Sequence, residues 1–165
     1  MSEAGPTIRL FPLERRKIIK KTIAGSIFWV LLLAIAAIIL PFMSGFEQAG
    51  IITAIACLLF IVVIILILFW YQTLYFEKYY YDIREDFLVI KKGVFAPRET
   101  VLPYEKIQDV YIDQDIFDRI FNLWDLHVST ATYLSGQEAH IDGVSLENGE
   151  AMKKMILEKI KTSKK

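Results

Sequence analysis

Two apolar stretches in the first half of the chain decide its architecture: TIAGSIFWVLLLAIAAIILPF at residues 22–42 and IITAIACLLFIVVIILILFWYQTL at residues 51–74. Across residues 22–76, Glu47 is the only charged residue. Because a helix rises ~1.5 Å per residue, roughly 20 apolar residues span a ~30 Å hydrocarbon core. The pattern predicts a membrane protein whose two transmembrane helices form a tight hairpin over residues 22–76.

We expect these helices at about residues 22–43 and 50–75, because Pro, Ser and Gly between Pro41 and Gly50 are typical of a helix end and a reversal. A soluble protein would need a much larger body to bury two such helices, and the remaining residues suffice for one small core. A cleaved signal peptide would have a shorter apolar region followed by a small-residue cleavage site. The sequence therefore favours two uncleaved spans.

Basic residues flank the two apolar stretches on the same side. None lies between the stretches, Lys78 and Arg84 follow the second one, and a larger group precedes the first. The positive-inside rule then predicts a multi-pass protein of the cell membrane with both termini in the cytoplasm. The preceding basic residues are Arg9, Arg15, Arg16, Lys17, Lys20 and Lys21.

Residues 1–21 are expected to form a basic cytoplasmic arm next to the bilayer. Each cation close to an anionic surface contributes about 1 kcal/mol of attraction, so this cluster could hold anionic lipid, or it could only set the topology. Residues 77–165 carry 13 basic and 16 acidic side chains, a balance that argues against nucleic-acid binding. The candidate lipid contacts are Arg15, Arg16, Lys17, Lys20 and Lys21.

Residues 77–165 are predicted to form a small cytoplasmic domain, in which the apolar period changes from helical to alternating. Six short strands and a helical turn after Asp115, a possible N-cap, are followed by apolar residues at helical spacing between Ala151 and Ile160. A turn is expected at Ser135–Gly136. The predicted strands are residues 79–84, 87–91, 98–102, 108–113, 126–131 and 139–144.

The stretch Leu102-Pro103-Tyr104-Glu105-Lys106-Ile107-Gln108 is the most specific of several short motifs in this domain. These motifs and the order of the elements resemble the bacterial pleckstrin-homology (PH) family of small membrane proteins. The resemblance implies a mainly-β PH-like barrel capped by a C-terminal helix, after a membrane helical hairpin. Where the family usually has Gly, this chain has Asn122, which tolerates the left-handed conformation better than most residues. We therefore expect that turn to be kept.

The sequence offers little catalytic or metal-binding chemistry. It has no Gly-rich phosphate loop and no nucleophile elbow, and its single cysteine, Cys57, lies within the second apolar stretch. A hairpin turning at Ser135–Gly136 would place His127 and His140 about 13 Å apart, too far for one metal ion. We therefore expect a protein that is not an enzyme and has no cofactor and no metal site.

Four polar residues of the family-like motifs are candidates for a partner surface or for structural hydrogen bonds: Arg98, Gln108, Arg119 and Asn122. The leading hypothesis is a non-catalytic, membrane-anchored interaction module that binds a membrane or cytoplasmic protein, or itself as a homo-oligomer, at the cytoplasmic face. The alternative is a sensor of anionic lipid that uses the basic arm and the domain surface. The bilayer is a partner in both hypotheses, and nucleic acid in neither.

Overall fold

The computed structural model describes residues 7–44, 47–130 and 139–163. The chain divides into two compact units, which we describe separately. One unit is the apolar segment Ile18–Leu74. The other combines the N-terminal residues up to Lys17 with Tyr75–Lys165, so that it is built from both sides of the apolar segment. We had expected the domain to begin near residue 77 and residues 1–21 to form a separate arm.

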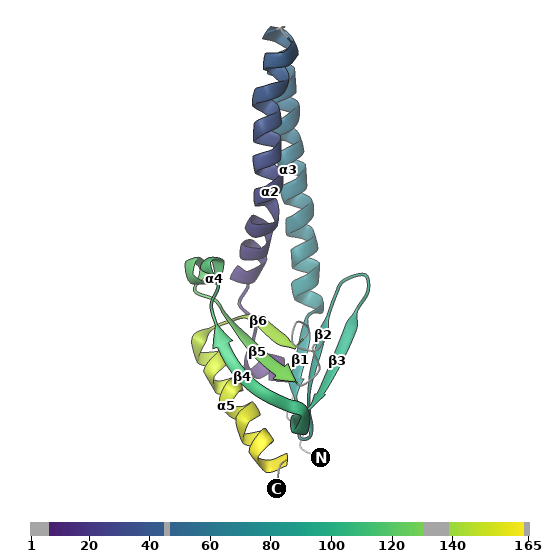
Figure 1. Ribbon diagram of the computed structural model, residues 1–165. Helices are drawn as coiled ribbons and strands as arrows, with labels where there is room; N and C mark the ends of the chain where they lie inside the picture. Colours follow the sequence, from purple (N-terminus) through teal and green to yellow (C-terminus); the bar gives the residue numbers. More distant parts are fainter. Residues whose placement is uncertain (1–6, 45–46, 131–138, 164–165) are drawn as a thin grey trace. The chain divides into compact units, whose positions relative to one another are not determined.

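The apolar unit consists of two long helices, α2 (Arg16–Ser44) and α3 (Glu47–Lys78), which lie side by side in Figure 1. Gly25 of α2 faces Leu68 of α3, because a Cβ atom on Gly25 would lie 3.8 Å from Leu68 Cδ1. Almost none of their length is buried, and both are long and apolar enough to cross a bilayer. The two helices are thus compatible with the predicted pair of membrane spans.

Both helices extend beyond the predicted ends. The segment from Pro41 to Gly50, predicted as a turn, is helical up to Ser44 and again from Glu47. Pro41 therefore lies in the last turn of α2, where it has no N–H to donate to the carbonyl four residues earlier. At the other end, α3 continues to Lys78, past the predicted limit at residue 75.

The described part of the second unit contains six antiparallel strands, close to those predicted. They form two three-stranded sheets, β1-β2-β3 and β4-β5-β6. The predicted barrel is therefore wrong in one respect: within the described residues the strands do not close into a single barrel. The strands are β1 (Tyr80–Ile83), β2 (Phe87–Lys92), β3 (Arg98–Pro103), β4 (Ile107–Asp113), β5 (Trp124–Thr130) and β6 (His140–Val144).

The core of this unit lies between the sheets and the C-terminal helix α5 (Leu146–Ser163). Alternating side chains of the strands are buried, as in β1, where Tyr81 and Ile83 point inward. Met152 and Ile156 are fully buried on one face of α5, which packs on β4 and β5. The amphipathic helix thus covers apolar surface that the sheets leave open.

Three short helical segments complete the unit: α1 (Thr7–Leu10), η1 (Tyr104–Lys106) and α4 (Ile116–Phe121). The predicted cap of α4 is confirmed, because the Asp115 carboxylate accepts the Asp118 N–H and the Asp118 carboxylate accepts the Asp115 N–H. Asn122 ends α4 in the left-handed conformation, with φ 51° and ψ 51°. The expectation that Asn preserves this turn is therefore also confirmed.

Candidate functional site

A buried ion pair joins the N-terminal segment to β6. Lys17 Nζ lies 2.8 Å from Asp142 Oδ1, and the two side chains are only 3% and 5% exposed. Lys17 Nζ also lies 4.0 Å from the centroid of the Tyr79 ring, in a cation–π arrangement. A pair so completely enclosed is closed to an external ligand, and it fixes residue 17 to β6.

The ring of Tyr79 lies against the Lys17 side of this ion pair. Its hydroxyl donates a 2.9 Å hydrogen bond to the His140 carbonyl. Burial raises the pKa of Tyr79 well above its usual value of 10, and the negative charge of Asp142 raises it further. Tyr79 therefore stays a neutral hydroxyl beside the Lys17–Asp142 pair.

Gly143, next to Asp142, makes room for the lysine. Its φ is +79°, and a Cβ atom on it would lie 2.7 Å from Lys17 Cδ and 2.9 Å from Lys17 Cβ. Its carbonyl accepts a 2.8 Å hydrogen bond from the Glu14 N–H. Its own N–H donates to Asp125 Oδ1 at 2.8 Å. The backbone of β6 is therefore shaped to receive residues 14–17.

The start of the N-terminal segment is held on β1. The Thr7 N–H and hydroxyl both donate to Asp82 Oδ1 at 3.0 Å, and the hydroxyl oxygen accepts the Ile83 N–H at 2.9 Å. Partial burial would raise the pKa of Asp82, but the hydrogen bonds from Thr7 and Arg84 outweigh it and lower that pKa. The Tyr81 hydroxyl donates to the Phe11 carbonyl. Residues 7–17 are thus an integral part of the domain.

The two histidines are much closer than predicted. His127 pairs directly with His140 across β5 and β6, and their rings stack with centroids 5.5 Å apart. Tyr111 stacks on the other face of His127 at 4.9 Å. The predicted separation of the two histidines was wrong because it assumed a turn at Ser135–Gly136, which lies outside the described residues. The register between the two strands decides which residues pair, and it places His127 opposite His140.

Each histidine of this stack lies next to a charged side chain. His127 Nε2 lies 3.0 Å from Asp113 Oδ1, and His140 Nδ1 lies 3.3 Å from Lys92 Nζ. Within the part of the chain that the structure describes, no three His, Cys, Asp or Glu side chains gather in a metal-binding arrangement. The positive charge of Lys92 beside His140 also disfavours the binding of a metal cation there.

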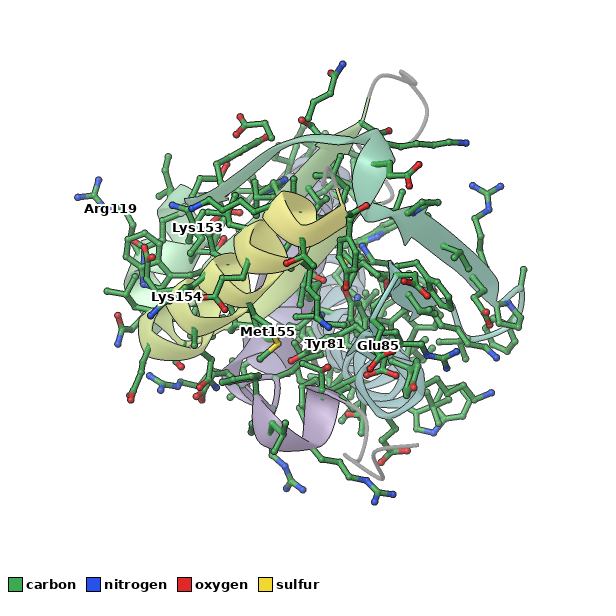
Figure 2. All side chains as sticks on the ribbon, turned by 90° about the horizontal axis from the view of Figure 1, so that it is seen from below. Tyr81, Glu85, Arg119, Lys153, Lys154 and Met155 are labelled. Carbon is green, nitrogen blue, oxygen red and sulfur yellow. The ribbon has the colours of Figure 1, made fainter. Side chains whose placement is uncertain are left out.

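The four predicted surface residues lie on three different elements. Arg98 begins β3, Gln108 lies at the irregularity of β4, and Arg119 and Asn122 belong to the end of α4. All four are exposed. Figure 2 shows Arg119 extending away from the rest of the domain. The structure thus brings Arg119 and Asn122 together and places Arg98 and Gln108 on separate sheets.

The predicted lipid contacts do not share one environment. Arg15 and Arg16 are exposed and Lys21 is half-buried, whereas Lys17 and Lys20 are only 2% and 4% exposed. Lys17 is used inside the domain, as described above. The sequence could not distinguish Lys17 from the neighbouring basic residues, because its partner Asp142 lies 125 residues away along the chain.

A pocket of about 560 Å³ lies against the β1-β2-β3 sheet. Three cations, Lys78, Arg84 and Lys91, line it together with Glu99. Lys91 lies 3.9 Å from Glu99, and Arg84 lies 3.1 Å from Asp82, so part of its positive charge is balanced. Sequence reasoning missed this pocket because its residues come from three separate segments.

The arrangement defines a class of protein: a small β domain closed by a C-terminal helix and joined to two long apolar helices. The family model described as "Bacterial PH domain" matches residues 17–160, which include both apolar helices. The chain therefore belongs to the bacterial PH domain family, and the resemblance seen in its motifs is confirmed. A comparison with curated proteins and one with solved structures each found no match.

Proposed function

We propose that this chain is a membrane-anchored, non-catalytic interaction module that binds a protein partner, or a second copy of itself, along β3 at the cytoplasmic face. Membership in the PH family supports an interaction role in general, and the two apolar helices support anchoring. The basic residues that flank the two apolar stretches favour cytoplasmic termini.

The observation that carries the proposal is the edge of β3. Among the described residues, β2 is the only strand that pairs with β3, so one backbone edge of β3 is open. An open edge presents N–H and C=O groups to which another strand can pair, and side chains beside it then select the partner. Val101 on β3 is 49% exposed, and Phe95 in the preceding loop is 79% exposed. Arg98 lies at the start of the same strand.

Site-specific photocrosslinking in intact cells tests this proposal. A photoreactive residue at Val101 or Arg98 is expected to give a discrete adduct with another chain, whereas one at Leu157 on α5, which is 39% exposed, is not. Arg119 provides a second surface position for comparison. Val101→Lys, but not the β-branched control Val101→Thr, should weaken the adduct formed from Arg98. Equal labelling at all positions, or none at Val101 and Arg98, would contradict the proposal.

The pocket lined by Lys78, Arg84 and Lys91 favours a second candidate function, the recognition of anionic lipid. Arg15 and Arg16 are exposed as well and would contribute further positive charge to the recognition of anionic lipid. Native mass spectrometry of the full chain, released from nanodiscs of mixed neutral and anionic lipid, tests this function. Retention of anionic lipid that falls in Arg84→Gln/Lys91→Gln, but not in the control Lys153→Gln/Lys154→Gln on α5, would support it. Equal retention in both variants would exclude this pocket.

A further inference from the structure

The short helix α4 exposes an apolar face. Ile116 is 78% exposed and Ile120 is 69% exposed. Because they are four residues apart in a helix, their side chains lie on the same face. Asp118, in contrast, is fully buried on the opposite side. This face is formed by two large apolar side chains with exposed Arg119 next to them.

The end of α4 is tied to the residue at which the chain enters the first apolar helix. Arg16 NH1 donates a 3.3 Å hydrogen bond to the Phe121 carbonyl, and both residues belong to the same compact unit. Arg16 is also the first residue of the candidate span Arg16–Leu40. The end of α4 is therefore bound to the residue from which the chain continues directly into this candidate span.

The chemistry of the face matches a bilayer surface better than a protein. Helices that lie in a membrane interface combine bulky apolar side chains with basic neighbours, which attract anionic headgroups. Here Arg15, Arg16 and Arg119 are all exposed. A stable protein interface buries about 800 Å² on each partner, more than the single face of a six-residue helix supplies.

We propose that Ile116 and Ile120 insert into the headgroup region of the bilayer and thereby hold the domain against the membrane surface. The inference rests on the membrane anchoring in the proposed function, but not on the partner strand at β3. It assigns a role to α4 that is separate from the basic pocket on the β1-β2-β3 sheet.

Fluorescence quenching with the full chain in nanodiscs tests this inference. Each disc holds one chain, so that a second copy cannot cover α4. An environment-sensitive dye is attached to a single cysteine introduced as Ile116→Cys, Ile120→Cys or the control Leu157→Cys, each in a Cys57→Ala background. These side chains are exposed, so the substitutions leave the core unchanged. In a fourth sample the dye is placed on native Cys57, within α3.

The inference predicts that lipids with a shallow spin label quench the dye at residues 116 and 120 at least about twofold more than at residue 157. Lipids with a deep spin label should quench the dye at Cys57. Strong quenching at Cys57 with values at 116 and 120 equal to the control would overturn the inference and leave anchoring intact. Absence of quenching at every position would overturn both.

Discussion

Arg16 and Lys17 are neighbours in sequence and carry the same charge, yet the structure places them in opposite surroundings. The Arg16 side chain is 51% exposed and lies 3.4 Å from Glu14, whereas that of Lys17 is 3% exposed and lies 2.8 Å from Asp142. The comparison shows that the basic stretch at the start of α2 is not one functional cluster. Lys17 is a structural residue of the domain, whereas Arg16 belongs to its surface.

The largest expected effect comes from removing one member of the buried pair. Lys17→Met leaves Asp142 charged and enclosed, which should destabilise the domain by about 3–5 kcal/mol. The double variant Lys17→Met/Asp142→Leu replaces the pair by apolar groups and should recover most of that loss. Pulse proteolysis of the full chain in mild detergent measures both. A single variant as stable as the unchanged protein would contradict the buried pairing.

Removal of the Thr7 hydroxyl should have the next largest effect. Thr7→Val leaves the Ile83 N–H without its acceptor and Asp82 without one donor, which should cost about 1–3 kcal/mol. Thr162→Val is the matched control, because Thr162 is exposed and its hydroxyl bonds only within α5. The same proteolysis assay compares the two variants, and equal stabilities would argue against docking of Thr7 on β1.

Gly143→Ala should destabilise the domain by about 1–2 kcal/mol through its positive φ alone, and Lys17 must also shift to admit the methyl group. Gly149→Ala serves as the control. Gly149 lies in α5, where Ala is the better helix former, and its new Cβ would be 3.4 Å from Ile112 Cδ1. Thermal unfolding should rank Gly143→Ala clearly below Gly149→Ala. The reverse order would exclude the close approach of Lys17 to β6.

The Asp82 carboxylate makes the docking of Thr7 sensitive to acid. Its folded pKa is lowered from the ordinary 3.8, so its contribution to stability is present above pH 3.8. That contribution is lost as the pH falls through the lower folded value. Hydrogen exchange of residues 7–11 should therefore accelerate in that range, and Asp82→Asn should remove this step. A step that persists in Asp82→Asn must arise from another group.

Arg16→Gln should have the smallest effect on the domain, about 0.5 kcal/mol or less, because exposed ion pairs contribute little. Pulse proteolysis of Arg16→Gln and Lys17→Met under the same conditions compares their stabilities directly. A loss as large as that of Lys17→Met would remove the distinction between the two residues.

The sequence predicted the features that depend on local pattern. Strand β1 was predictable because Tyr81 and Ile83 alternate with polar residues, and the left-handed Asn122 because of its side-chain type. The docking of Lys17 was not predictable, because a basic residue beside an apolar helix is usually exposed. The stack of His127 on His140 depends on the register between β5 and β6, and local pattern does not fix a register.

Hydrogen exchange at the Glu14 amide in the full chain tests the central claim most directly, namely that residues 7–17 complete the PH-like domain. This N–H donates to the Gly143 carbonyl at 2.8 Å. We predict that it exchanges as slowly as the amides of β6 and loses this protection in Lys17→Met. Exchange at the rate of an unstructured peptide in the unchanged protein would contradict the claim.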